Sequence, residues 1–114
     1  MLIVKDPIKI ELVSELASHL YGEMIKAVVD VDKRIMAIDS ELHYELETLL
    51  LKEGSSQESL WGYNIYPDLF GEEDFIEFDS LINIRPRQNN RSRDVEDPTI
   101  RQKIIEITNS LIEE

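Results

Sequence analysis

The chain contains no cysteine, which excludes disulfide bonds and thiolate metal sites. Glycine is also scarce, with 4 residues among 114, and the sequence has neither a glycine-rich phosphate loop nor a GxSxG nucleophile motif. No apolar run approaches the roughly 18 residues of a membrane span, and the run at residues 1–4 is too short for a signal-peptide core. We therefore expect a cytoplasmic protein that has no membrane association and needs no cofactor.

Acidic residues outnumber basic ones by 24 to 12, giving a formal net charge of −12. The simplest interpretation is a solvated acidic surface that keeps the protein soluble. Such a surface repels nucleic acids and anionic membranes, so any anionic partner must be bound by a local basic patch. The length suits one domain with one hydrophobic core.

Three stretches have apolar residues at helical spacing and predict amphipathic helices. The first covers residues 9–20, and the second runs from a predicted N-cap at Ser40 to Gly54. The third begins at Asp97 and Pro98, because Asp is a favoured N-cap and Pro a favoured first helical residue.

Strand signals fill the remaining apolar stretches, at residues 2–5, 24–31, 34–38 and 62–67. The second and third of these predict a hairpin that turns at Asp32 and Lys33. Apolar and polar residues then alternate over residues 76–85, which predicts a single long, half-buried strand ending at Pro86.

Together these elements predict an α+β fold for a single domain over residues 1–114. We expect a largely antiparallel sheet of four to five strands, with the three amphipathic helices packed mainly on one face.

Four of the six arginines, Arg85, Arg87, Arg91 and Arg93, fall within nine residues that contain no acid. Guanidinium groups are planar, forked donors that suit phosphate and carboxylate. Neutral side chains nearby could add hydrogen bonds, so the candidate anion-binding residues are Arg85, Arg87, Arg91, Arg93, Asn83 and Asn89. In the competing interpretation, the arginines pair with acids of the same chain, such as those that follow at residues 94–97. Exposed pairs of that kind contribute only about 0–1 kcal/mol each.

A second candidate site follows from the predicted long strand. On it, Glu77, Asp79, Asn83 and Arg85 would share one face, with nearest same-face neighbours about 7 Å apart. Two carboxylates beside a guanidinium suit hydrolytic chemistry, so Asp79 and Glu77 are possible acid or base groups. The ordinary alternative is a solvent-facing strand surface.

Three further groups have weaker signals. His43 and Glu47 share a helix face, three aspartates surround the hairpin, and four aromatic residues could stack bases near the arginines. Each has a more ordinary interpretation, as a surface contact, as turns and caps, or as core, and we predict no metal site. The three aspartates are Asp30, Asp32 and Asp39, and the four aromatic residues are Trp61, Tyr63, Tyr66 and Phe70.

Long segments of the chain resemble a family of small uncharacterised prokaryotic proteins, catalogued as a domain of unknown function. The similar segments are IMAIDSELHYELETLLLKEGSSQESLWG (residues 35–62), LWGYNIYP (60–67) and FIEFDSLINIRPRQNNRSRDVEDPTIR (75–101). The resemblance implies a stand-alone domain of this size, and it supplies no activity, cofactor or catalytic residue.

Three functions stay open at this point. The first is a binding module whose arginines contact an anionic small molecule, a nucleic acid or an acidic protein segment. The second is a small hydrolase or phosphate-handling enzyme with Asp79 or Glu77 beside Arg85. The third is an acidic interaction protein that forms homo-oligomers, such as a homodimer.

Overall fold

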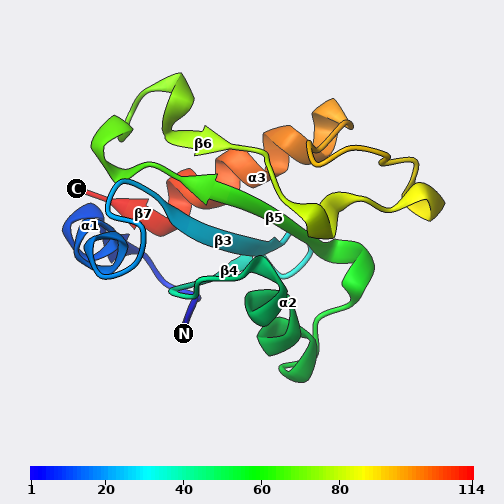
Figure 1. The fold of residues 1–114 in the computed structure, drawn as a ribbon, viewed down its shortest axis with the longest axis horizontal. Helices are drawn as coiled ribbons and strands as arrows, with labels where there is room; N and C mark the ends of the chain where they lie inside the picture. Colours follow the sequence, from blue (N-terminus) through cyan, green and yellow to red (C-terminus); the bar gives the residue numbers. More distant parts are fainter.

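A five-stranded antiparallel sheet, in the order β1-β4-β3-β5-β6, forms the centre of the computed structural model, which describes residues 1–114 (Figure 1). Its strands are β1 (Leu2–Val4), β3 (Ile25–Asp30), β4 (Ile35–Ile38), β5 (Leu60–Ile65) and β6 (Ile76–Glu77). The helices are α1 (Ile10–Ser18), α2 (His43–Lys52) and α3 (Pro98–Leu111). The α+β prediction is confirmed. None of the helices is both long and apolar enough to cross a membrane.

Two elements that the sequence did not predict form a second, two-stranded sheet. In it β2 (Ile8–Lys9) runs parallel to β7 (Ile112–Glu113), so the segment before α1 lies beside the segment after α3. Five short 3-10 helices occupy the connections: η1 (Gln57–Ser59), η2 (Pro67–Leu69), η3 (Glu73–Phe75), η4 (Leu81–Asn83) and η5 (Pro86–Gln88).

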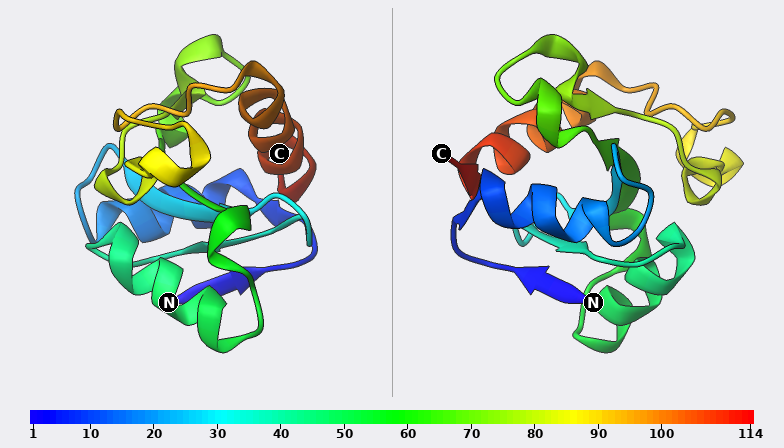
Figure 2. Two further views of the ribbon diagram at one scale, coloured as in Figure 1. Left: turned by 90° about the vertical axis from the view of Figure 1, so that its right-hand side faces the viewer. Right: turned by 60° about the vertical axis from the view of Figure 1, so that its left-hand side comes forward.

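The helices cover both faces of the sheet (Figure 2). Helices α1 and α3 pack on one face, where Ala27 and Val29 of β3 join the larger core cluster. Helix α2 packs on the other face, where Val28 contacts Leu46 and Leu50 in a smaller cluster. The expectation of helices mainly on one face therefore fits α1 and α3, while α2 covers the opposite side.

The predicted hairpin is present as β3 and β4, but its turn is longer than two residues. Asp30 pairs with Ile35, so residues 31–34 form the loop. The Asp30 carboxylate accepts hydrogen bonds from the backbone N–H groups of Asp32 and Lys33, both at 2.9 Å. Arg34 completes the turn in the left-handed region, with φ of 58°. A buried aspartate therefore organises this turn, in place of the glycine that shorter turns favour.

The predicted starts of α2 and α3 have different outcomes. Asp97 caps α3 as expected, because its side chain accepts a hydrogen bond from the Thr99 N–H at 2.8 Å. Ser40 does not cap α2. Its hydroxyl accepts the Leu42 N–H at 3.2 Å, which closes a turn before the helix, and the N-cap is Leu42.

The long strand predicted over residues 76–85 is wrong. Only Ile76–Glu77 pairs with β5, and the Ser80 hydroxyl then accepts the Ile82 N–H at 3.3 Å and starts η4. Phe78 packs against the larger core cluster and Ile82 against the smaller one, so the alternating apolar residues serve opposite faces of the sheet.

A side chain replaces the missing strand partner of β5. The Asn83 amide donates to the Gly62 carbonyl and accepts from the Gly62 N–H, both at 2.8 Å. The close approach of residues 80–83 to β5 needs glycine at position 62, because an added Cβ would lie 2.6 Å from the Ser80 hydroxyl oxygen. Asn83 thus satisfies buried backbone groups that a continuous strand would otherwise satisfy.

We expect Asn83→Ala to lower the free energy of unfolding by about 2–4 kcal/mol, because two buried backbone groups of Gly62 lose their partner. Urea unfolding at pH 7 measures this, with Asn109→Ala on the exposed side of α3 as a matched control that should stay within about 0.5 kcal/mol. Equal unfolding midpoints for the two variants would show that Asn83 has no such role.

Candidate functional site

The arginines lie on a projecting segment, residues 85–93, that we call the arginine arm (Figures 1 and 2). Its tip is a tight loop closed by two backbone hydrogen bonds, from Arg85 N–H to Asn90 O at 2.7 Å and from Asn90 N–H to Arg85 O at 3.1 Å. Between them lie η5 and Asn89, whose φ of 60° allows the chain to reverse.

Asn90 holds the arm against the chain segments that precede and follow it. Its side-chain N–H groups donate to the carbonyls of Asn83 (2.8 Å) and Asp94 (2.7 Å), and its amide oxygen accepts the Glu96 N–H at 2.8 Å. Asn90 is 2% exposed, whereas the neighbouring Asn89 is exposed. No local pattern in the sequence distinguishes these two asparagines, because their roles depend on which one points inward.

Arg85 is a structural residue. Its guanidinium donates to the carbonyls of Leu60 (2.5 Å) and Gln57 (2.9 Å), and it pairs with the Glu47 carboxylate at 3.4 Å. It also lies over the Trp61 ring, 4.9 Å from the centroid. These contacts anchor the arm to β5 and α2, and they leave Arg85 poorly placed to receive a ligand.

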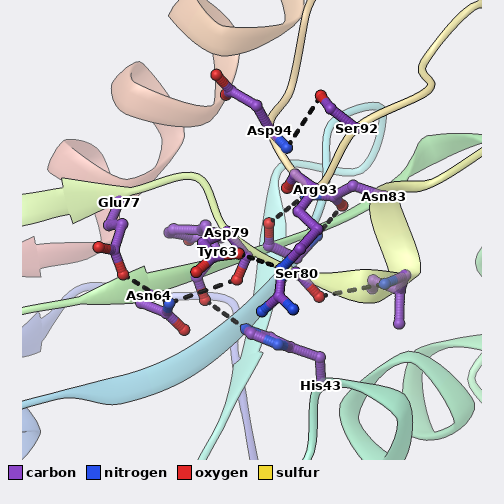
Figure 3. A network of polar contacts seen from close by, with 12 residues as sticks. His43, Tyr63, Asn64, Glu77, Asp79, Ser80, Asn83, Ser92, Arg93 and Asp94 are labelled. Carbon is purple, nitrogen blue, oxygen red and sulfur yellow. Dashed lines mark hydrogen bonds and ion pairs between the residues drawn. The ribbon is translucent and has the colours of Figure 1, made fainter.

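Arg93 is paired, but it remains accessible. It forms an ion pair with Asp79 at 2.5 Å, and 54% of its side chain is exposed. Its guanidinium extends toward His43 in the polar network of Figure 3. A nearby pair of the same kind joins Arg101 to Asp94, also at 2.5 Å.

Arg87 and Arg91 are exposed, and their side chains form neither a hydrogen bond nor an ion pair with the rest of the chain. Arg91 uses only its backbone N–H, which donates to Glu96 at 2.9 Å. Arg87 borders an open hollow of about 700 Å³ that is lined by charged and polar residues and one proline. Its lining residues are Gln57, Glu58, Arg85, Pro86, Arg87 and Gln88.

The two possible acid or base residues do not lie beside Arg85, because the strand that would align them does not form. Asp79 pairs with Arg93. Glu77 accepts hydrogen bonds from the Asn64 amide at 2.9 Å and the Tyr66 hydroxyl at 3.0 Å. Neither residue lines the hollow at Arg85.

The two asparagines expected to assist anion binding lie in different environments. Asn83 is fully buried, and both of its N–H groups are engaged, by the carbonyls of Gly62 and Arg93. Asn89 stays exposed at the tip of the arm. Asn89 is therefore the one of the pair that a ligand can reach.

His43 and Glu47 have a structural role that the sequence did not reveal. Both are buried on the face of α2 that meets the arginine arm. The His43 Nε2 donates to the Tyr63 carbonyl at 2.8 Å, so the neutral ring carries its proton there. Burial lowers the pKa of His43 and raises the pKa of Glu47, with Arg85 partly opposing the rise. Only the contact partners, distant in sequence, distinguish these residues from surface ones.

The three aspartates around the hairpin contact different partners, and the four aromatic residues lie in different environments. Asp30 accepts the Ser55 hydroxyl at 2.6 Å, Asp32 accepts the Ser59 hydroxyl, and Asp39 lies 3.7 Å from the N-terminal amine. Among the four aromatic residues, Trp61 and Tyr63 are almost fully buried, Phe70 packs against the core, and Tyr66 binds Glu77.

The different environments of the arginines predict different effects on stability. Arg85→Ala leaves Glu47 buried without its partner and should cost about 3–5 kcal/mol. Arg87→Ala removes an exposed side chain without contacts and should change stability by less than about 0.5 kcal/mol. Urea unfolding of both variants measures the difference. A similar midpoint for the two would contradict the assignment of Arg85 as structural.

His43 should make stability depend on pH. Its folded-state pKa lies below the unfolded value of about 6.5, so the unfolded chain binds a proton more readily. Acidification below pH 6.5 therefore favours unfolding. We expect the unfolding free energy of the wild type to fall more between pH 7 and 5 than that of His43→Gln, which can keep the N–H donor to Tyr63 but does not titrate. Parallel curves would mean that His43 titrates alike in both states.

Comparison with known proteins supplies a family for this fold. The model of the family described as Protein of unknown function (DUF5674) matches residues 2–111. Neither a curated protein nor a solved structure matches the chain. Because the family match covers nearly the whole sequence, the chain belongs to this family of unknown function.

Proposed function

We propose that the protein is a binding module that contacts an anionic partner through Arg87 and Arg91. The observation that supports this most directly is that neither guanidinium group forms an ion pair or a hydrogen bond within the chain, although the chain has 24 acidic residues. Charge-assisted hydrogen bonds to phosphate or carboxylate would satisfy both groups.

The fixed backbone of the arm favours binding. Two hydrogen bonds close the loop at Arg85 and Asn90, and the Gln88 side chain donates to the Glu58 carbonyl at 3.1 Å. The arginines therefore extend from a loop that is already held against the body of the protein. A preorganised loop loses less conformational entropy on binding than a flexible one.

Arg93 can add a third contact. Its ion pair with Asp79 is about half exposed on both sides, and exposed pairs contribute only about 0–1 kcal/mol. A ligand that offers a better-placed anion can compete for this guanidinium at small cost. Arg85 takes no part in the proposed contact, because its donors are used by backbone carbonyls and Glu47.

The test compares wild type with the double variant Arg87→Ala/Arg91→Ala. Three labelled anionic probes are titrated at low salt: polyphosphate, poly-glutamate and a single-stranded oligonucleotide. We expect at least one probe to bind the wild type, with affinity that falls as salt rises. The double variant should bind that probe about tenfold or more weakly, because two charge-assisted contacts are lost.

Lys5→Ala/Lys103→Ala is the matched control. It removes the same charge from two exposed lysines outside the arm that form no hydrogen bond or ion pair. It should reduce binding far less than the arginine variant does. Equal weakening by both double variants would indicate a nonspecific effect of net charge, and absence of binding to every probe would contradict the proposed function.

A further inference from the structure

Two large apolar side chains are exposed immediately before the arginine arm. Leu81 is 66% exposed and Ile84 is 44% exposed. Between them, Ile82 packs against the smaller core cluster and Asn83 is fully buried. The Ile84 N–H donates to the Leu81 carbonyl at 3.2 Å and closes the 3-10 turn, so these two exposed residues lie at its two ends.

The backbone brings Arg91 close to Ile84. Arg85 and Asn90 form an antiparallel bridge, and both of their side chains point inward. The bridge brings their chain neighbours, Ile84 and Arg91, close together, and both of these residues are exposed. We call the exposed side chains beside this bridge, Leu81, Ile84 and Arg91, together with Arg87 at the tip of the arm, the mixed patch.

The mixed patch lacks what recognition of bases needs. Single-stranded nucleic acid is commonly held by exposed aromatic rings between basic side chains. Here Trp61 and Tyr63 are 2% and 0% exposed, and Phe78 is covered by Arg101, 4.4 Å from its ring centroid. The exposed aromatic residues, Tyr21 and Tyr44, lie outside the arm. Aliphatic side chains beside free guanidinium groups instead match carboxylates that alternate with apolar residues.

We infer that the partner is an acidic protein segment carrying aliphatic or aromatic side chains. Its carboxylates contact Arg87 and Arg91, and its apolar side chains cover Leu81 and Ile84. This inference rests on the proposed function and names the chemistry of its partner. The acidic loop of a second copy, residues 68–74, fits less well, because its own apolar side chains, Leu69 and Phe70, already pack against the core.

The experiment uses two peptides of equal length and charge. One alternates Glu with Leu and Phe, and the other has Ser at each apolar position. Fluorescence anisotropy should show that the wild type binds the apolar acidic peptide about tenfold or more tightly than the serine peptide. Leu81→Ser/Ile84→Ser should lose this preference while it keeps the weaker, salt-dependent binding of the serine peptide. Both substitutions are at exposed positions, and thermal unfolding verifies that the variant is folded.

Tyr44→Ser/Leu51→Ser on α2 is the matched control, since it also removes two exposed apolar side chains, and it should keep the preference. Amide shifts in a ¹⁵N NMR titration should map to residues 81–93. A wild type that binds both peptides equally, or an oligonucleotide more tightly than either, would overturn the inference. So would a dimer in light scattering that Leu81→Ser/Ile84→Ser abolishes. Those results differ from failure of the proposed function, in which no anionic probe depends on Arg87 and Arg91.

Discussion

The Asn83 amide joins the C-terminal third of the chain to the sheet, and the arginine arm depends on it. Asn83 completes the hydrogen bonding of Gly62 on β5, its second N–H donates to the Arg93 carbonyl at 3.0 Å, and its own carbonyl accepts from Asn90. One buried residue therefore connects β5 to the arm, through its side chain at Arg93 and through its backbone carbonyl at Asn90. A regular strand would pair with Gly62 through its backbone, but it would leave no free chain to form a loop at this position.

The four clustered arginines have two different roles, which their charge alone does not distinguish. Arg85 is 10% exposed at its side chain and organises backbone carbonyls from two segments. A buried ion pair such as Arg85–Glu47 adds little net stability, because both groups lose hydration, but it is costly to break. It therefore fixes the position of the arm more than it strengthens the fold. That leaves Arg87 and Arg91, at the outer edge, as the members available to a partner.

Local patterns predicted the parts of this fold that local physics determines. Helical spacing located α1, α2 and α3, Asp97 marked the start of α3, and β-branched residues marked the hairpin. The prediction of a long strand failed because an alternating pattern of apolar and polar residues does not show which face of the sheet each apolar residue reaches. Phe78 and Ile82 reach opposite faces. Likewise, Arg85 binds Glu47, 38 residues away, and no pattern within residues 85–97 identifies that partner. The free arginines could be identified only once the pairs were known.

A cationic arm on an acidic body constrains how an acidic partner can approach. The net charge of −12 repels such a partner from most of the surface, so attraction is confined to the arm and the encounter is oriented. Salt weakens this orienting term, because the charges are exposed. Contacts with Leu81 and Ile84 do not depend on salt in that way, since they bury apolar surface. In the proposed complex, charge therefore sets where and how fast the partner binds, and the apolar side chains set how long it stays.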